Sequence, residues 1–474
     1  MNYETTIGLE VHVQLKTQSK MFCACPTGYG AAPNTLVCPV CLGYPGAMPV
    51  MNEEAIRLTV LTGLMIGSNI NELSKFDRKS YFYPDMPKNY QISQYDRPLC
   101  LGGSVVIEVD GVEKTIGITR IHLEEDVGKS THMARSSGVD FNRAGHPLME
   151  IVTDPDMTSP AEAYAFLVAL KQILLYIGVS DCNLEEGNMR CDVNVSMRPA
   201  GQKSLGTKAE LKNLNTFKGV QHALHYEVER QSGMLTRGER VIQETRRWDP
   251  DQGITTSMRT KEDAHDYRYF PEPDLMPVVL AAAQIGALKA TLPELPRTRR
   301  FRFAEQYGIP AYDAGVLSAD RDIADFFEAA AGLSSNPKAV SNWIMTDVLR
   351  VLAERETTLA ALPLTAAALA SLVGLVDKGS INMTGAKTVF EVLIDNGGDP
   401  ARIVNERGLA QVSDGGAIES LVDDAIVANP RSVEDYRNGK KAALQFLVGQ
   451  VMKQSRGKAN PPMVMEILMR KLEG

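Results

Sequence analysis

Apolar and polar residues alternate along a segment close to the start of the chain. Between Ile7 and Gln14 every second residue is apolar, and Glu10 and His12 lie at polar positions in between. Alternate side chains of a β-strand point to opposite faces of a sheet. The pattern therefore predicts a strand with one face in the core and with Glu10 and His12 side by side on the other. These two groups could share one cation, although a solvent-facing polar row has the same pattern.

Two later segments repeat this alternation with more polar side chains. Asp192, Asn194 and Arg198 alternate with apolar residues, and Glu210 and Lys212 do the same farther along the chain. Asn and Asp are poor strand formers, so their regular placement favours a strand face that lines a site. A solvent-exposed strand face remains the alternative.

The character of the chain changes near Pro293. Short alternating segments and turn residues dominate before it, and long segments rich in Ala and Leu dominate after it. We therefore predict an α+β fold with a sheet-rich cradle at residues 1–292, a helical domain at 293–405 and a small all-α tail at 406–474. The prolines between Leu292 and Pro296 suit a linker.

Charge is distributed unevenly along the chain. The formal net charge is −8, so the chain is not expected to coat nucleic acid over its whole surface. From Pro430 onward, however, nine Lys or Arg residues stand against four Asp or Glu residues. Asn460 before Pro461 predicts the N-cap and first turn of a final helix. The tail is therefore predicted to be helical and locally basic.

Four of the seven cysteines are crowded into one short segment. Cys23 and Cys25 form one pair, and Cys38 and Cys41 form a second. Four thiolates in two close pairs suit a closed tetrahedral Zn²⁺ site, which supports a loop and leaves no position open for catalysis. Free thiols are the alternative. The chain has neither a secretory signal pattern nor a membrane-length apolar run, so we expect a reducing, cytoplasmic location without membrane contact.

Aromatic and basic residues are concentrated between Asp77 and Asp96. Aromatic residues make up only 6% of the chain, yet five of them fall in this segment beside Arg78, Lys79 and Lys88. Cations among aromatic rings suit contacts with phosphates and bases. An aromatic mini-core under a proline-rich loop would have the same composition, and both interpretations stay open.

A row of acidic residues forms a further candidate site. Glu124, Glu125 and Asp126 are consecutive, and Glu150 follows farther on. Adjacent carboxylates repel one another and usually stay charged only beside cations. One or two carboxylates together with substrate phosphates commonly hold Mg²⁺ at nucleotide sites. The group is a candidate magnesium site, with a solvated strand end as the alternative.

Several long motifs of this chain resemble one known family, the B subunits of the Asp/Glu-tRNA amidotransferases. The resemblance spans nearly the whole chain and rests on the cysteine pairs and on GLEVH at 8–12, KSYFYPDMPKNYQ at 79–91, LEED at 123–126, DVNVSMRP at 192–199, KAELKNLN at 208–215 and VGQVMKQSRGKANP at 448–461. Motifs of this length are more specific than a lone glycine fingerprint. The resemblance implies a sheet-rich catalytic cradle, a helical domain and a helical tRNA-binding tail.

The resemblance also implies a reaction and partners. The expected enzyme is a carbon–nitrogen ligase that uses ATP to phosphorylate the side-chain carboxylate of mischarged Glu-tRNA(Gln) or Asp-tRNA(Asn), which ammonia then converts to the amide. The chain has no Ser- and Gly-rich amidase segment with a partnering lysine. Ammonia is therefore expected from an amidase A subunit, and a small C subunit is expected to clamp the heterotrimer.

The expected site residues combine the resemblance with the polar strand faces. The expected ligands of Mg²⁺ are Glu10, His12, Glu125 and Glu150, and Glu124 is an alternative to Glu125 because neighbouring strand residues point opposite ways. The expected catalytic residues are Glu10, His12, Lys79, Glu124, Glu125 and Glu150. The expected cofactor-binding residues, with ATP as the nucleotide, are Arg78, Lys79, Lys88, Asp192, Asn194, Arg198 and Glu210. The expected lining of an ammonia passage is Lys88, Asp192, Arg198, Glu210 and Lys212.

Basic residues of the tail are expected to contact tRNA phosphates, although solvated helix residues would have the same pattern. They are Lys440, Lys441, Lys453, Arg456 and Lys458. Two rival functions remain open at this point. A non-catalytic RNA-binding scaffold leaves the polar strand faces unexplained, and a tRNA-independent carboxylate–amine ligase leaves the basic tail unexplained.

Overall fold

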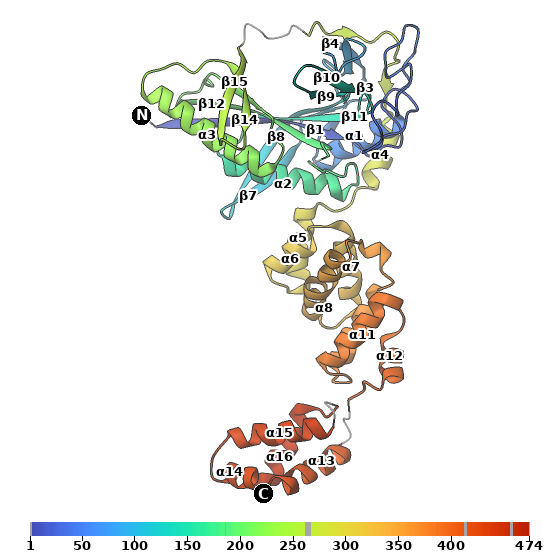
Figure 1. Cartoon of the computed structure of the whole chain (residues 1–474), viewed down its shortest axis with the longest axis vertical. Helices are drawn as coiled ribbons and strands as arrows, with labels where there is room; N and C mark the ends of the chain where they lie inside the picture. The colour runs from blue at the N-terminus through green and yellow to red at the C-terminus, as the bar shows by residue number, and fades with distance from the viewer. Residues whose placement is uncertain (1, 185, 261–266, 412–414, 456–457, 474) are drawn as a thin grey trace. The chain divides into compact units, whose positions relative to one another are not determined.

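The chain divides into two compact units, Met1–Leu295 and Pro296–Gly474 (Figure 1). The computed structural model describes residues 2–184, 186–260, 267–411, 415–455 and 458–473.

The described strands all lie in the first unit. They are β1 Tyr3–Gln14, β2 Asn69–Ile70, β3 Leu73–Ser74, β4 Asp77–Ser80, β5 Tyr90–Ser93, β6 Cys100–Leu101, β7 Ser104–Val109, β8 Val112–Glu125, β9 Lys129–His132, β10 Ser137–Asp140, β11 Pro147–Thr153, β12 Met189–Pro199, β13 Ala209–Lys212, β14 Glu244–Asp249, β15 Ile254–Thr260, β16 Phe270–Pro271 and β17 Val278–Val279. The helices of this unit are α1 Glu53–Met65, α2 Pro160–Tyr176, α3 Phe217–Thr236 and α4 Ala282–Ala290.

A ten-stranded sheet forms the frame of the first unit. Its strand order is β15-β14-β13-β12-β1-β11-β8-β6-β2, and β7 pairs with β8. Neighbouring strands are antiparallel except β13 and β14, which are parallel. The alternation predicted from Ile7 to Gln14 is confirmed, because its apolar residues are buried and its polar residues are half-buried. Smaller sheets, including β16-β4-β5 and β10-β9, flank the large one.

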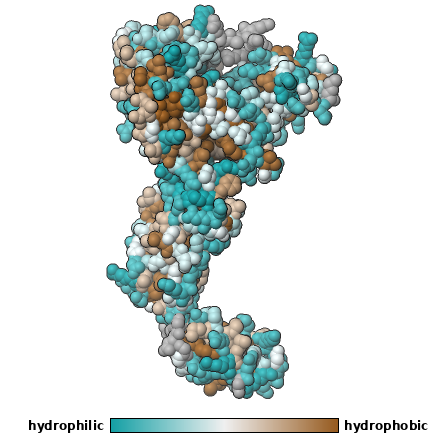
Figure 2. Space-filling view, turned by 180° about the vertical axis from the view of Figure 1, so that it is seen from behind, coloured by the Kyte–Doolittle hydropathy of each residue, from teal (hydrophilic) through white to brown (hydrophobic). Residues whose placement is uncertain are grey.

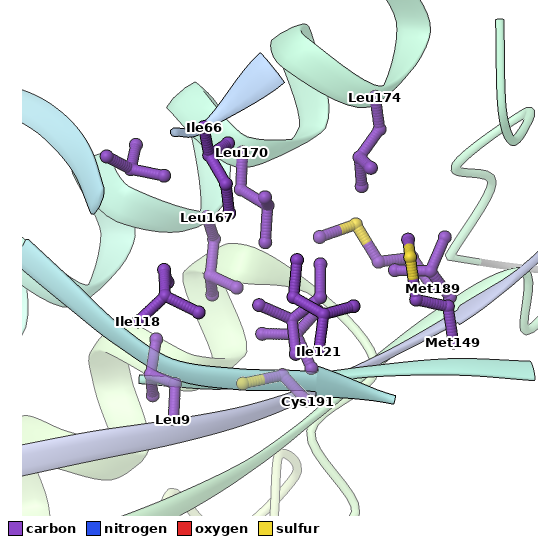
Figure 3. Packing of buried hydrophobic residues seen from close by; sticks show 14 of the residues in the cluster. Leu9, Ile66, Ile118, Ile121, Met149, Leu167, Leu170, Leu174, Met189 and Cys191 are labelled. Carbon is purple, nitrogen blue, oxygen red and sulfur yellow. The ribbon is translucent and has the colours of Figure 1, made fainter. Parts of the chain in front are cut away.

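Helices α2 and α3 cover the apolar face of the large sheet (Figure 1). Leu167, Leu170 and Leu174 of α2 pack in the same core as Leu9 of β1 and Met149 of β11 (Figure 3). Full burial of one such side chain stabilises a fold by about 1.5–3 kcal/mol. One face of the sheet therefore packs in the core, and the polar face is available for a binding or catalytic site.

The second unit is entirely helical where the structure describes it. Its helices are α5 Pro296–Tyr307, α6 Ala311–Leu317, α7 Arg321–Leu333, α8 Pro337–Trp343, α9 Leu349–Glu354, α10 Ala366–Asp377, α11 Met383–Asn396, α12 Pro400–Arg407, α13 Gly415–Ala428, α14 Pro430–Arg437, α15 Ala442–Gln454 and α16 Pro461–Glu473. A π-helical turn at Ile344–Val348 joins α8 to α9, and a short 3-10 turn lies at Leu359–Ala361.

The last four helices share a core of their own. Ile418, Leu447, Val464 and Leu468 are among its buried residues. The predicted start of the final helix is confirmed, because the Asn460 side chain accepts a hydrogen bond from the Met463 amide at 3.3 Å. The α+β fold is thus confirmed, with a sheet-rich part followed by helices. The further division of the helical part at residues 405/406 stays a prediction.

The surface of the first unit carries apolar side chains as well as polar ones. Tyr44, Val50, Met276 and Val279 are all exposed. Figure 2 shows apolar residues gathered on the displayed face of this unit. Among the described residues, no helix combines the length and the apolar character that a bilayer crossing requires.

Candidate active site

Strand register brings distant polar residues together on the open face of the large sheet. His12 on β1 lies opposite Glu150 on β11, and Glu150 lies opposite His122 on β8. On the other side of β1, Glu10 lies opposite Asp192 on β12. Because side chains at paired positions share a face, these residues form one continuous polar row.

Three side chains at this face form a compact group. His12 Nε2 lies 3.2 Å from Glu150 Oε2 and 3.7 Å from Glu124 Oε1. One ligand atom from each residue lies within 4.8 Å of the other two, a spacing that one metal ion could bridge. We call His12, Glu124 and Glu150 the carboxylate–histidine triad.

Two further basic groups border the triad. His122 Nε2 lies 3.5 Å from Glu150 Oε2 and 3.8 Å from Glu124 Oε2. Lys79 Nζ lies 4.0 Å from the same oxygen of Glu124. His122 is absent from the residues expected at the site, yet its position two residues before Glu124 on one strand places it on the same face.

Ion pairs within the triad keep its carboxylates anionic. Burial raises the pKa of the Glu150 carboxyl, but the charges of His122 and His12 outweigh it and lower that pKa well below the usual range. Burial lowers the pKa of His12, but its hydrogen bond and charge interaction with Glu150 outweigh it and raise the pKa to about 9. Glu150 therefore stays anionic, and His12 carries the proton that balances part of the carboxylate charge. Carboxylate oxygens are the ligands that Mg²⁺ prefers, so the group fits that ion.

Glu125 lies next to the triad in sequence but not in space. Its Oε1 contacts the ammonium of Lys88 and accepts a hydrogen bond from the Ile92 amide at 2.9 Å. Successive residues of a strand point to opposite faces, so Glu124 turns toward His12 while Glu125 turns away. The geometry therefore favours Glu124, the alternative ligand, over Glu125.

Glu10 adjoins the triad without belonging to its closest group. Its Oε1 accepts a hydrogen bond from Asn194 Nδ2 at 2.9 Å. Burial, followed by the charges of Glu150 and Asp192, raises the pKa of the Glu10 carboxyl. Glu10 on β1 and Asn194 on β12 thus link the triad to the next strand of the polar row.

The row continues over β12 and β13 as alternating charges. Lys212 Nζ lies 2.5 Å from Asp192 Oδ2 and 3.0 Å from Glu210 Oε1. These three residues are expected in the lining of one passage, and the structure places them side by side. Arg198 does not join them, because it pairs with Glu4 at 3.2 Å near the far end of β12.

The two neighbouring cations on β4 have different surroundings. Arg78 is engaged by the Glu272 carboxylate at 2.7 and 2.9 Å, so its guanidinium is directed away from the triad. Lys79, which points the opposite way, lies 4.9 Å from the ring centroid of Tyr267. Tyr269 follows on the same segment and stacks on Tyr95 with 4.2 Å between ring centroids.

Sequence reasoning missed these two tyrosines. The segment YRYFP at 267–271 resembles the YFYP of 81–84, and this repeated composition is the available signal. The two segments are almost two hundred residues apart in the chain and follow no regular spacing. Only the pairing of β16 with β4 reveals their proximity.

The four paired cysteines form a second cluster, which we call the cysteine knuckle. Their sulfur atoms lie within 4.8 Å of one another, and Cys38 Sγ and Cys41 Sγ are 3.9 Å apart. Zinc–sulfur bonds of about 2.3 Å in a tetrahedron require sulfur atoms to lie about 3.8 Å apart. All four cysteines are free of disulfide bonds. The arrangement therefore fits a structural Zn²⁺ ion.

The knuckle lies close to the end of β8, beside Glu125. A cavity beside it is lined by Cys23, Cys41, Gly43, Lys88 and Glu125 among others. Lys88 thus contacts Glu125 on one side and borders the knuckle on the other. It does not join the ion pair of Lys212 with Asp192, with which it is expected to line an ammonia passage.

Comparison with known proteins identifies the family. The family model for the GatB/GatE catalytic domain matches residues 5–286, and the model for the GatB domain matches residues 325–472. The chain belongs to the GatB family. It is 53% identical to the B subunit of the aspartyl/glutamyl-tRNA(Asn/Gln) amidotransferase from Carboxydothermus hydrogenoformans over 99% of both chains. It is also 53% identical to the protein of that name from Halorhodospira halophila, and 52% to that from Thermoanaerobacter pseudethanolicus, over 100% of each chain. The resemblance drawn from the motifs is confirmed.

The two family models cover both the candidate catalytic residues and the candidate tRNA-binding tail. The catalytic-domain match includes the triad and the knuckle, and the GatB-domain match includes the basic tail. In the tail, Lys440 pairs with Asp435 at 2.8 Å. Lys441, Lys453 and Lys458 are exposed and form no ion pair within the described residues. Arg456, the fifth expected phosphate contact, lies outside the described residues.

Proposed function

We propose that this chain is the catalytic B subunit of a tRNA-dependent amidotransferase, a carbon–nitrogen ligase. It would phosphorylate the side-chain carboxylate of mischarged Glu-tRNA(Gln), Asp-tRNA(Asn) or both, at the expense of ATP. The observation that carries the proposal is the carboxylate–histidine triad beside Lys79, in a chain 53% identical to proteins named for this activity. The same identity disfavours the scaffold and the tRNA-independent ligase.

The chemistry explains why such a site requires cations. A carboxylate is anionic and has no leaving group, so ammonia does not attack it. Transfer of the γ-phosphoryl group of ATP to a carboxylate oxygen releases ADP and gives an acyl phosphate. Attack of ammonia on the acyl carbon then forms the amide bond, and phosphate leaves with the carbon–oxygen bond electrons.

The residues of the triad have distinct roles in this proposal. His12, Glu124 and Glu150 would hold Mg²⁺, which neutralises phosphate charge during such transfers. Lys79 Nζ lies 4.0 Å from Glu124 Oε2. From there its ammonium would orient the ATP phosphates as a point charge. His122 contacts both carboxylates and would fix their orientation. Arg78 has no such role, because Glu272 and Asp274 engage it.

The alternating charges next to the triad support a route for ammonia. Asp192, Lys212 and Glu210 form a hydrogen-bonded series that leads along the polar face toward Glu10. Polar residues of this kind would keep a small polar molecule within the site. The ammonia would come from an amidase A subunit, and a small C subunit would complete a heterotrimer in the cytoplasm. Apolar surface on the first unit (Figure 2) suits such contacts.

The helical tail would hold the body of the tRNA. Lys441, Lys453 and Lys458 are exposed cations without carboxylate partners in the described residues, and such groups contact phosphates without reading sequence. Replacing Lys441 and Lys453 with glutamine should weaken tRNA binding and lower its salt dependence by about 1–2 units of slope. The matched control is Arg470→Gln, because Arg470 already pairs with Glu419.

The test of the proposed function is ATP turnover by this chain copurified with its partner subunits. The reaction contains ammonium and either mischarged Glu-tRNA, mischarged Asp-tRNA or no tRNA. We expect turnover and amide formation only with a mischarged tRNA, and the accepted tRNA identifies the amino acid. Turnover without tRNA would support the small-substrate ligase, and tRNA binding without turnover would support the scaffold.

A further inference from the structure

One lysine of the first unit is buried beside the cysteine knuckle. Lys20 is 1% exposed and is among the largest fully buried side chains of the chain. Its Nζ lies 3.7 Å from Cys41 Sγ and donates a hydrogen bond to the Phe141 carbonyl at 3.3 Å. Lysines are almost never fully buried unless they are paired with a negative group.

In the part of the chain that the structure describes, no carboxylate pairs with the Lys20 ammonium. There, no Asp or Glu oxygen lies within 4.0 Å of Lys20 Nζ, whereas the surface lysine Lys16 pairs with Asp181 at 2.6 Å. A carbonyl oxygen satisfies one of the three ammonium donors and supplies no charge. The remaining neighbour that could carry negative charge is the sulfur of Cys41.

A knuckle that holds zinc would supply the negative partner that the Lys20 ammonium needs. Four thiolates around one Zn²⁺ carry a net charge of two minus. Cys41 is the most buried of the four cysteines, at 5% exposure, so water screens the charge of its sulfur least. A buried charge without a partner is strongly destabilising, and this applies both to Lys20 alone and to an anionic cluster alone.

We propose that Lys20 is a built-in counter-ion of a four-thiolate zinc site and strengthens zinc binding through Cys41. The ammonium offsets half of the net charge of the loaded cluster at its most buried corner. Lys20 is thus a positioning residue for the metal and has no direct part in the reaction of the triad. This inference depends on zinc in the knuckle and not on the proposed amidotransferase activity.

The main chain ties Lys20 to the same loop. Its amide donates a hydrogen bond to the Cys25 carbonyl at 2.9 Å. A Cβ added at Gly145 would lie 3.4 Å from Lys20 Cδ, so the aliphatic stem is closely packed. A purely structural role of this stem is therefore the competing explanation, and a substitution that keeps the stem but removes the charge separates the two.

The experiment measures zinc affinity of the purified full chain by competition with a chromophoric chelator. Lys20→Met keeps most of the stem and removes the charge, and Lys16→Met is the matched control from an exposed ion pair. We expect Lys20→Met to bind zinc about 10–100-fold more weakly, as is usual for groups that support metal ligands. Lys16→Met should bind zinc as the parent does. A Lys20→Met protein that folds and binds zinc within about threefold of the parent would overturn the proposal.

A change of ligand charge separates charge from packing. Cys38→His replaces a thiolate by a neutral imidazole and reduces the negative charge of the cluster by one. If Lys20 acts as a counter-ion, Lys20→Met should weaken zinc binding less in the Cys38→His background than in the parent. Equal losses in both backgrounds would assign Lys20 to packing alone.

Further variants address a failure to fold. If Lys20→Met does not fold, Lys20→Arg and Lys20→Gln replace it, and the glutamine variant should bind zinc about 10–100-fold more weakly than the arginine variant. Equal zinc binding by these two variants would overturn the proposal. A parent protein that binds no zinc, while its four cysteines react freely with an alkylating reagent, would overturn it as well.

Discussion

The first unit carries two clusters of residues that could each hold a metal ion, and they are built in opposite ways. The cysteine knuckle is contained in one loop between Cys23 and Cys41, whereas the triad takes His12, Glu124 and Glu150 from three strands. The knuckle needs only local chain geometry and a metal, while the triad exists only if β1, β11 and β8 pair in the correct register. The first cluster is therefore encoded by spacing and the second by the whole sheet.

The largest expected effect follows from removing the carboxylate at the centre of the triad. Glu150 contacts both His12 and His122, at 3.2 and 3.5 Å. Glu150→Gln keeps the shape of the side chain but removes a charge that would help to hold Mg²⁺. We expect tRNA-dependent ATP turnover to fall by at least about 100-fold. The assay is steady-state turnover of the assembled complex, and exposed Glu72→Gln is the control.

A folded Glu150→Gln protein with near-parental turnover would remove the triad from the reaction. In either case zinc binding by the knuckle should be unaffected, because the two clusters are built independently.

The next effect distinguishes two neighbouring glutamates. Glu124→Gln removes a triad ligand, so the Mg²⁺ concentration for half-maximal turnover should rise by about 10-fold or more. Glu125→Gln instead leaves the nearly buried ammonium of Lys88 without its carboxylate. This should lower the free energy of unfolding by about 3 kcal/mol, with a smaller change in Mg²⁺ dependence.

Titrations with Mg²⁺ and denaturant unfolding on the same two proteins check this difference. If Glu125→Gln had the larger effect on Mg²⁺ dependence, Glu125 would be the ligand, as the motif resemblance implies, and the strand end would have to rotate to bring it there.

A smaller effect on activity is expected from loss of the knuckle metal. Cys38→Ser combined with Cys41→Ser removes two ligands from a closed site, so bound zinc should be lost entirely. The loop between Cys23 and Cys41 should then become sensitive to proteolysis. Turnover should fall by about tenfold or less, because the knuckle supports the loop and supplies no ligand to the triad. Zinc analysis, limited proteolysis and turnover measure the three outcomes. A loss of turnover as large as that of Glu150→Gln would place the knuckle in the reaction itself.

The contrast between the clusters also explains how much the sequence could predict. The alternation in β1 and the cap at Asn460 are local signals, and both predicted elements are present. The cysteine spacing is a local signal as well, and the four sulfur atoms lie together, while the zinc ion stays a prediction. The choice between Glu124 and Glu125 is not local, because it depends on the register in which β8 pairs with β11, which decides which of the two shares a face with Glu150.

Competition between distant partners is equally invisible in the sequence. Arg78 has the character of a phosphate ligand until its pairing with Glu272, which lies far along the chain, is known. Tyr267 and Tyr269 come beside Lys79 only because β16 pairs with β4. Composition can identify the residue types of a site, but long-range pairing decides which of them are free to act.

The smallest expected effect tests whether the loop of the knuckle is coupled to the triad through Lys88 and Glu125. Gly43 in the knuckle has φ of +70°, and a Cβ added there would lie 2.5 Å from Lys88 Cγ. Gly43→Ala is therefore disfavoured both by its backbone conformation, at about 1–2 kcal/mol, and by contact with the side chain that holds Glu125. Gly46, which is also in the positive-φ region at +81° but has open space around its added Cβ, provides the matched control.

Both alanine variants should lose similar backbone stability, but only Gly43→Ala should also raise the Mg²⁺ requirement. The increase should be a few-fold at most, because the flexible Lys88 side chain can shift. Titration of turnover with Mg²⁺ measures this difference. Equal Mg²⁺ dependence of the two variants would mean that the knuckle and the triad are energetically separate, and that the contact through Lys88 and Glu125 only fills space.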